Sequence, residues 1–380
     1  MASSWSSLPP MELLVGGRYQ ILRQIVSSGP HATENVYVGR SLASGTVVAI
    51  KVESTNKTNR KLKSEAKIHR LLTNTPGFPA FRWYGAAGSD KNVLVTDFLG
   101  PSLEYLLAQC GGRFQLKTVV LIADQLLSRL ESFHAKHMVH CNIHPSNFVV
   151  GLSLAASHVH MIDFGGAQRY RDSMTFRHVP YEQGKRVRGA FRFMSINVHL
   201  GIKLSRRDDL ESLGYMLIFL LKGHLPWQGL HGERKVERIL ERKLNLPLPV
   251  LCSGCAPEFR AFLDYARALR FDETPDYAYL KGLFRQVYVR QSLFGDERFD
   301  WMDGRDIPWP PQNNQAAQPL QTTPSQEFDD RIGQGVGMHQ VESALFGHVE
   351  DDEMKLPSPG SDTKSDRWSV RGSDIDDTTQ

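Results

Sequence analysis

The spacing of apolar and polar positions predicts that the first part of the chain is rich in strands. Residues 47–53 (VVAIKVE) form a β-branched run that is typical of a buried strand. Residues 60–72 (RKLKSEAKIHRLL) instead repeat at helical spacing, with one apolar stripe. The positions of that stripe are Leu62, Glu65, Ile68 and Leu72. We therefore expect a small lobe of strands with one helix over residues 17–96.

Beyond Gly100 the pattern becomes mostly helical. Apolar residues at steps of three and four predict a long helix with one buried face, namely Val119, Ile122, Leu126, Leu130 and Phe133. Residues 210–223 are apolar nearly all round, which predicts a helix buried on most sides. Two short strands are expected between them, at 148–150 and 158–163. The pattern thus indicates an α+β chain, with a larger helical lobe over about 100–302.

Composition and charge separate the two ends of the chain from this body. Residues 1–16 form an N-terminal extension, and 303–380 are rich in Pro, Gln, Ser and acidic residues, which predicts a disordered tail. Residues 312–380 hold 13 acidic and 5 basic side chains, a net charge of −8, which leaves +12 for 1–311 because the whole chain carries +4. A basic body favours anionic partners, its own acidic tail among them.

Several classes of protein are not supported. No RNP, helix-turn-helix or zinc-finger signature accompanies the basic charge, so nucleic acid is not the partner we expect. Cys252 and Cys255 form a C-x-x-C pair, but no second pair or nearby His completes a zinc or redox site. No apolar run reaches the roughly 20 residues that span a bilayer. We expect a monomer, without membrane segments, in the cytoplasm, the nucleus or both.

Two motifs have the residue types that hold a nucleotide and its metal. Lys51 ends the strand VAIK, and Glu65 lies on the following helix, so a glutamate can hold a lysine that grips phosphates. Asp163-Phe164-Gly165 follows an apolar strand, sixteen residues after Asn147. A carboxylate and an amide oxygen at this spacing are suited to Mg²⁺ that bridges ATP phosphates. We expect both ATP and Mg²⁺ to bind, though weakly.

The stretch MVHCNIHPSNFVVG (138–151) has the frame of a protein-kinase catalytic loop, H-R-D-x-K-P-x-x-N, with its working parts exchanged. Asn142 stands where the frame has Asp, and His144 where it has Lys. Asn has almost no basicity, and losing a general base costs about 10²–10⁴ in rate. His144 is shorter than lysine and mostly neutral near pH 7. Cys141 replaces the loop arginine.

The phosphate-covering loop is also altered. Between Ile25 and Val36 the chain reads VSSGPHATEN, in which Gly29 is the single glycine and Pro30 removes a backbone donor. An ordinary hairpin without a nucleotide role remains the alternative for this stretch.

The chain resembles the casein kinase I family of serine/threonine protein kinases. The stretches that carry the resemblance are FLGPSLEYLL (98–107), SINVHLGIKLSRRDDLESLGYMLIFLLKGHLPWQGL (195–230) and FDETPDYAYLKGLFRQVYVRQ (271–291). It covers about residues 17–302 and implies a bilobal kinase fold. It also implies that ATP hangs from a hinge at Asp97-Phe98-Leu99, behind a gatekeeper at Thr96.

Three of the departures from this family replace residues that act together in its catalytic loop. The family's threonine that bonds the loop Asp and Lys is Ala190 here, so Asp, Lys and Thr are all replaced, by Asn142, His144 and Ala190. The resemblance also implies a basic site for acidic or phosphorylated substrates, matched by Arg192 and Lys235, with Lys185, Arg186 and Arg188 nearby. Asp209 matches a buried aspartate that fastens the catalytic loop.

These observations favour a pseudokinase that binds an acidic or phosphorylated protein. An active serine/threonine kinase with a modified catalytic loop is the alternative, because phosphoryl transfer relies largely on positioning and electrostatics.

Overall fold

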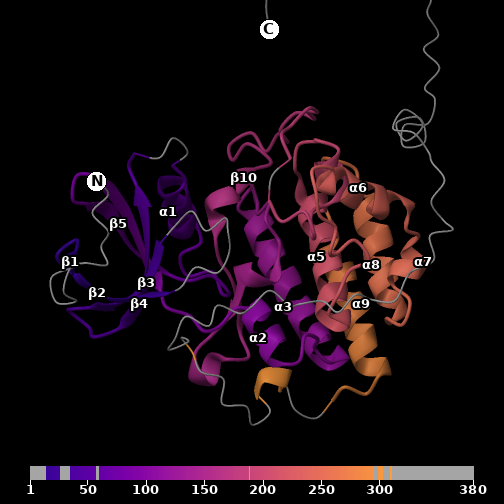
Figure 1. Ribbon diagram of the computed structural model, residues 1–380, viewed down its shortest axis with the longest axis horizontal. Coiled ribbons are helices and arrows are strands. Elements are labelled where there is room, and N and C mark those ends of the chain that lie inside the picture. The colour runs from indigo at the N-terminus through magenta and orange to yellow at the C-terminus, as the bar shows by residue number, and fades with distance from the viewer. Residues whose placement is uncertain are drawn as a thin grey trace, which may run out of the picture. The chain divides into compact units, whose positions relative to one another are not determined.

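The structure is a computed structural model that describes residues 14–25, 35–56, 60–187, 189–294 and 298–302, together with Trp309. Within this part of the chain, an antiparallel sheet with one helix precedes a mostly helical lobe (Figure 1). The order of elements is the one that the apolar pattern predicts. No helix of the described part is long and apolar enough to cross a membrane.

The N-terminal lobe is a six-stranded sheet in which all neighbours pair antiparallel. In spatial order its strands are β1 (Leu14–Val15), β2 (Tyr19–Ile25), β3 (Asn35–Ser41), β4 (Val47–Ser54), β6 (Lys91–Asp97) and β5 (Phe81–Ala87). Val48, Ile50 and Val52 of β4 are buried in one apolar cluster. Because side chains alternate along a strand, Lys51 points to the opposite face.

Helix α1 (Leu62–Leu71) packs on this sheet through a small apolar cluster of Leu62, Ala66 and Leu94. The stripe that the sequence predicts is buried throughout, since Leu62, Glu65, Ile68 and Leu72 are each less than a tenth exposed. The burial of Glu65 on this stripe fixes a carboxylate on the inner face of the helix.

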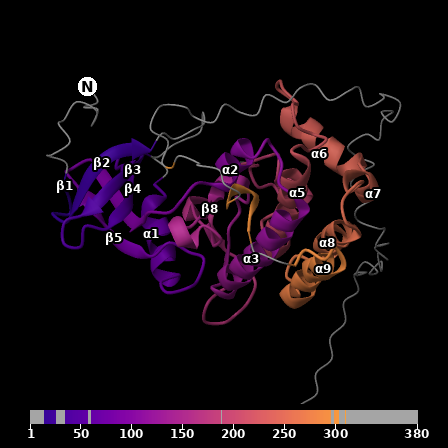
Figure 2. The same ribbon diagram turned by 90° about the horizontal axis from the view of Figure 1, so that it is seen from below.

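The C-terminal lobe contains eight α-helices within the described residues. They are α2 (Leu103–Gln109), α3 (Leu116–Ala135), α4 (Ile196–His199), α5 (Arg206–Lys222), α6 (Lys235–Asn245), α7 (Leu248–Leu251), α8 (Pro257–Ala268) and α9 (Tyr277–Arg290). Short 3₁₀ turns occur at Pro145–Asn147, Ser153–Ala155, Phe164–Gly166 and Asp300–Met302. Helix α9 packs on α3 and α8 packs on α5, as the view in Figure 2 also shows.

Helices α3 and α5 form the centre of this lobe. The five apolar positions predicted for α3 are fully buried. Nearly every side chain of α5 is buried too, which confirms the prediction made from residues 210–223. A capping box of Ser205 and Asp208 begins α5, and Gly223 ends it with a φ of 81°.

Two small antiparallel strand pairs position two loops of this lobe. Strand β7 (Met138–Val139) pairs with β10 (Gln168–Arg169), and β8 (Phe148–Val150) pairs with β9 (Val159–Met161). Residues 140–147 join β7 to β8, and residues 162–167 join β9 to β10. The pairing therefore places these two loops side by side.

Candidate active site

A cleft of about 1040 Å³ lies between the sheet and the helical lobe. It is lined from the sheet side by Lys51 and Glu65, and from the connection between the lobes by residues 96–100. From the helical side it is lined by Asn142, Asn147 and Asp163. The structure thus brings together, around one cleft, the residues from which the sequence predicts a nucleotide and metal site.

Lys51 is held between two carboxylates. Its Nζ is 2.8 Å from Oε2 of Glu65 and 3.1 Å from Oδ1 of Asp163. Burial alone would lower the pKa of Lys51, but the two carboxylates raise it above its usual value, so the ammonium stays charged. Burial would likewise raise the pKa of Asp163, but Lys51 and His140 lower it to about 2. The site therefore presents a fixed cation beside a fixed anion.

Asp163 and Asn147 are brought together by the two loops. The backbone N–H of Ile162 donates to the carbonyl of Asn147 over 3.0 Å, and Asp163 follows with a left-handed backbone, φ 61°. This conformation costs about 1–2 kcal/mol in a non-glycine residue. A charged carboxylate and an amide oxygen beside each other are hard oxygen ligands, the type that Mg²⁺ prefers. These residues fit the metal that the sequence predicts.

Packing beneath the site holds these loops. The ring of Phe164 contacts His69 of α1, with centroids 4.9 Å apart, and His140, at 5.8 Å. Asp209 of α5 accepts the backbone N–H groups of His140 (2.7 Å) and Cys141 (2.9 Å). Asp209 therefore fastens the catalytic loop to a core helix, as the resemblance implied. Sequence reasoning missed the contribution of His69, which only the packing of α1 against Phe164 discloses.

The side chains that would act on the transferred phosphate are arranged differently. The amide of Asn142 has no hydrogen-bond partner among the described residues, although its backbone carbonyl accepts from Nδ2 of Asn147 at 2.9 Å. Its Oδ1 lies 3.6 Å from the position that a Cβ would take on Gly189, next to Ala190. Ala190 has no hydroxyl to bridge this gap. The three-residue unit of the family is absent as a bonded unit.

His144 is neutral at this site. Burial first, then the electrostatic effects of His140 and Arg192, lower the pKa of His144 to about 4, against an opposing effect of Asp163. An uncharged imidazole cannot neutralise a developing phosphoryl charge as a lysine would. Burial also raises the pKa of the Cys141 thiol well above its usual value, so this position supplies no charge either.

Trp309 contacts the segment 97–99 between the lobes, which the sequence analysis did not predict. The carboxylate of Asp97 pairs with Nε of Arg82 at 2.6 Å and accepts the backbone N–H of Ala80 at 3.1 Å, so both of its oxygens are engaged within the sheet lobe. The carbonyl of Leu99 accepts the indole N–H of Trp309 over 3.0 Å, and the indole packs on Tyr105. Trp309 falls in the segment 303–380, for which we predicted a disordered tail. The feature of the sequence that could have indicated this contact is Trp309 itself, a single aromatic residue between two prolines.

The predicted basic site is distributed over several elements. The guanidinium of Arg192 lies 5.3 Å from the ring centroid of Phe219 and forms no ion pair within 4 Å with any described residue, although the carboxylate of Glu104 in α2 acts on it electrostatically. Lys235 begins α6 and is exposed. The expectation for Lys185 is weakened, because its Nζ pairs with Glu182, which also pairs with Lys203. Arg186 is exposed and lines the cleft.

Several predicted features lie outside the described residues, namely the loop with Gly29 and Pro30, Arg188, and the acidic tail from 312 onward.

A comparison with protein families matches the protein kinase domain to residues 24–264. The match begins in β2 and ends in α8, so it contains Lys51, Glu65, the loop with Asn142 and Asn147, and Asp163. It covers more than half of the chain and agrees with the strand-rich and helical lobes and the cleft between them. The chain belongs to the protein kinase domain family.

Proposed function

We propose that this kinase domain is of the casein kinase I type and acts as a pseudokinase. It binds Mg-ATP weakly, transfers little or no phosphate, and binds acidic or phosphorylated proteins. The carrying observation is the state of the catalytic loop: the side-chain amide at position 142 replaces a carboxylate and has no hydrogen-bond partner among the described residues, and His144 is neutral. Both the base and the charge that phosphoryl transfer uses are therefore missing.

Weak nucleotide binding is supported by the opposite edge of the same cleft. The bonds of Lys51 to Glu65 and Asp163 supply a phosphate grip and a metal ligand. The same assembled geometry favours the alternative, an active serine/threonine kinase, because positioning alone contributes much to phosphoryl transfer.

The partner class is inferred from charge. Arg192 carries a cation without an ion-pair partner in the described part, and Lys235 and Arg186 are exposed cations of the same lobe. Such groups suit an acidic or phosphorylated peptide. The segment 312–380, with its net charge of −8, is a candidate ligand from the same chain. We expect its deletion to strengthen the binding of an added phosphopeptide.

The transfer test compares the native chain with Asp163→Ala, both with Mg-ATP and acidic peptides. Site mapping by mass spectrometry separates true products from those of a contaminating kinase. We expect no difference between the two proteins. Turnover by the native chain that Asp163→Ala abolishes would establish the alternative.

The binding test measures the affinity for one peptide in phosphorylated and unphosphorylated forms. We expect tighter binding of the phosphorylated form, and a loss of that preference in Arg192→Ala with Lys235→Ala. Arg260→Ala is the matched control, because Arg260 is also exposed but pairs with Asp264 within α8. Equal affinity of the native chain for both peptides would overturn the partner assignment.

A further inference from the structure

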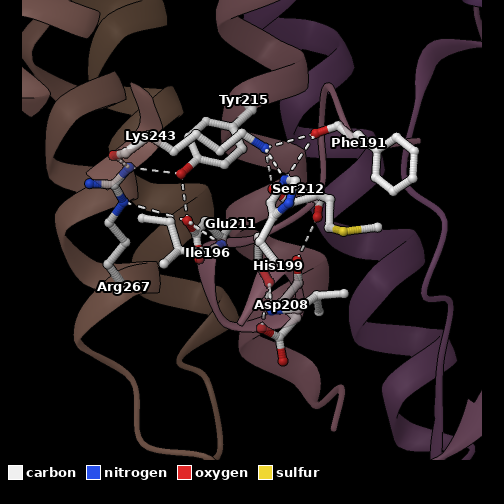
Figure 3. Close-up of polar contacts among 12 residues, drawn as sticks. Phe191, Ile196, His199, Asp208, Glu211, Ser212, Tyr215, Lys243 and Arg267 are labelled. Carbon is white, nitrogen blue, oxygen red and sulfur yellow. Dashed lines mark hydrogen bonds and ion pairs between the residues drawn. The ribbon is translucent and has the colours of Figure 1, made fainter. Parts of the chain in front are cut away.

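The chain segment that carries Arg192 rests on a buried lysine of α6. Lys243 is fully buried, and its Nζ donates to the carbonyls of Phe191 (3.0 Å) and Met194 (2.5 Å) (Figure 3). Nε2 of His199 lies 3.3 Å from the same Nζ. An ammonium has three N–H donors. Two of them are used by carbonyls on either side of Arg192, and the imidazole of His199, whose Nε2 also lies 3.3 Å from the carbonyl of Phe191, closes the group.

Both the backbone carbonyl and the guanidinium of Arg192 contact aromatic side chains of the same lobe. Its carbonyl accepts the indole N–H of Trp227 over 2.7 Å, so the carbonyls of residues 191, 192 and 194 are all bonded to donors in the helical core. Its guanidinium is backed by the ring of Phe219. The backbone cannot shift or rotate here without breaking these bonds, which fixes the point from which the Arg192 side chain starts.

Lys243 has no carboxylate of its own. Among the described residues it forms no ion pair, and the rings of Tyr215 and Trp227 lie 4.9 and 5.1 Å from its Nζ. Glu211 of α5 is the acidic group that acts on it electrostatically, and it raises the pKa of Lys243 against burial. That carboxylate is already engaged, however, since Arg267 of α8 approaches it to 3.5 Å and Tyr215 donates to it at 2.5 Å.

A buried cation without its own counter-ion is unfavourable for folding, and an apolar side chain of similar volume is often better tolerated. Burial lowers the pKa of Lys243 to about 7. The other titratable groups that face it do not change charge near that pH: burial and Lys243 lower the pKa of His199 to about 3, burial raises the pKa of Tyr215, and that of Arg267 is raised by Tyr215 and Glu211 against burial.

We propose that Lys243 is a positioning residue for an anion-binding surface formed at Arg192. The ammonium holds the carbonyls of Phe191 and Met194, and thereby sets the guanidinium for a phosphorylated or acidic peptide. This inference rests on the proposed function, because it concerns the binding of that partner class.

The first arm of the test measures the affinity for the phosphorylated peptide in Lys243→Met. We expect about tenfold weaker binding, because the two carbonyls that flank Arg192 lose their charged donor and the guanidinium loses its fixed starting point. Lys222→Met is the matched control, because Lys222 also donates to a backbone carbonyl, that of Leu251 at 2.9 Å, in a different part of the lobe. The control should bind as the native chain does.

The second arm separates positioning from a general loss of structure. In an Arg192→Ala background, Lys243→Met should cause no further loss, because its effect passes through Arg192. A structural defect would instead weaken both backgrounds equally.

The third arm needs no variant and decides the matter if Lys243→Met does not fold. From pH 7 to 9 the phosphate is already a dianion, with its second pKa near about 6. The native chain should bind the phosphopeptide less tightly as pH rises and the ammonium is lost, and a flat profile would overturn the proposal.

The outcomes distinguish two failures. If the native chain has no preference for the phosphorylated peptide, the proposed function fails and this inference fails with it. If the native chain has that preference and Lys243→Met retains the native affinity, only the role of Lys243 is overturned.

Discussion

The two edges of the cleft differ in how their side chains are held. At the nucleotide–metal edge (Lys51, Glu65, Asn147 and Asp163), every side chain is bonded to another part of the chain. At the transfer edge (Asn142, His144 and Ala190), the side chains themselves make no hydrogen bond to one another or to any other described residue, and Asn142 is bonded only through its backbone carbonyl. The backbone at both edges is fastened to a helix, by the contact of Phe164 with His69 of α1 on one and by Asp209 of α5 on the other.

This difference separates the side chains that join parts of the fold from those that would act on a phosphate. Asp209 bonds backbone N–H groups, so the catalytic loop keeps its path whatever side chain stands at position 142. The ion pairs of Lys51 join β4, α1 and the loop after β9, so their loss would leave buried charges unpaired. The domain can therefore lose transfer chemistry while it keeps a shape that binds ligands.

The largest effect is expected from rebuilding the transfer edge. The triple change Asn142→Asp, His144→Lys and Ala190→Thr should raise the phosphorylation rate by on the order of 10² or more, since base and charge return together. Each single change should remain near background, because effects within such a unit are strongly non-additive. Peptide phosphorylation with mass-spectrometric site mapping gives the rate.

The control for this experiment is Asp163→Ala added to the triple variant, which should return the rate to background. If the native chain already transfers phosphate as fast as the triple variant, the residues at positions 142, 144 and 190 do not limit catalysis, and the prediction is wrong.

The nucleotide–metal edge can be tested by its effect on thermal stability. A ligand at 100 times its dissociation constant adds about 2.7 kcal/mol to the free energy of unfolding. Mg-ATP at millimolar concentration should raise the Tm modestly, and Lys51→Met or Asp163→Ala should remove this rise. Lys281→Met is the control, since Lys281 also pairs with a carboxylate, that of Glu131 at 2.7 Å. No rise in the native chain at any concentration would contradict nucleotide binding.

The neutrality of His144 predicts a dependence of stability on pH. Its pKa is about 4 in the folded chain, against 6.5 for an unperturbed His. Between pH 6.5 and 4 the unfolded chain therefore binds more protons, and the folded state loses up to about 1.4 kcal/mol per pH unit relative to His144→Gln. Urea denaturation at several pH values measures this difference. The exposed His224, changed to Gln, serves as control, and parallel curves for His144→Gln and the native chain would refute the prediction.

The smallest effect concerns the hinge. Trp309→Ala should strengthen nucleotide binding about threefold, because one hydrogen bond to the Leu99 carbonyl is worth about 0.5–1.5 kcal/mol. Trp309→Phe keeps a ring for Tyr105 but removes the indole N–H, so it separates the bond from the packing. Titration with a fluorescent nucleotide gives the affinities, and unchanged values in both variants would show that Trp309 does not compete with nucleotide.

The sequence by itself predicted the order of the two lobes and several of their elements. The stripe of α1 and the five buried positions of α3 follow from apolar periodicity, which is a local property of the chain. The exchange of residues at positions 142, 144 and 190 was also visible, because a motif is read from residue types at fixed spacing.

The tertiary structure alone decided how those residues behave. The charge of His144 depends on its burial and on His140 and Arg192, and the support of Arg192 depends on Lys243, 51 positions away. The helices at 60–72 and 210–223 could be predicted because each repeats its own apolar pattern. The roles of Lys243 and Trp309 could not be predicted, because a hydrogen bond to a distant backbone carbonyl leaves no periodic pattern in the sequence. Desolvation and electrostatic effects on a pKa likewise arise only when the chain has folded.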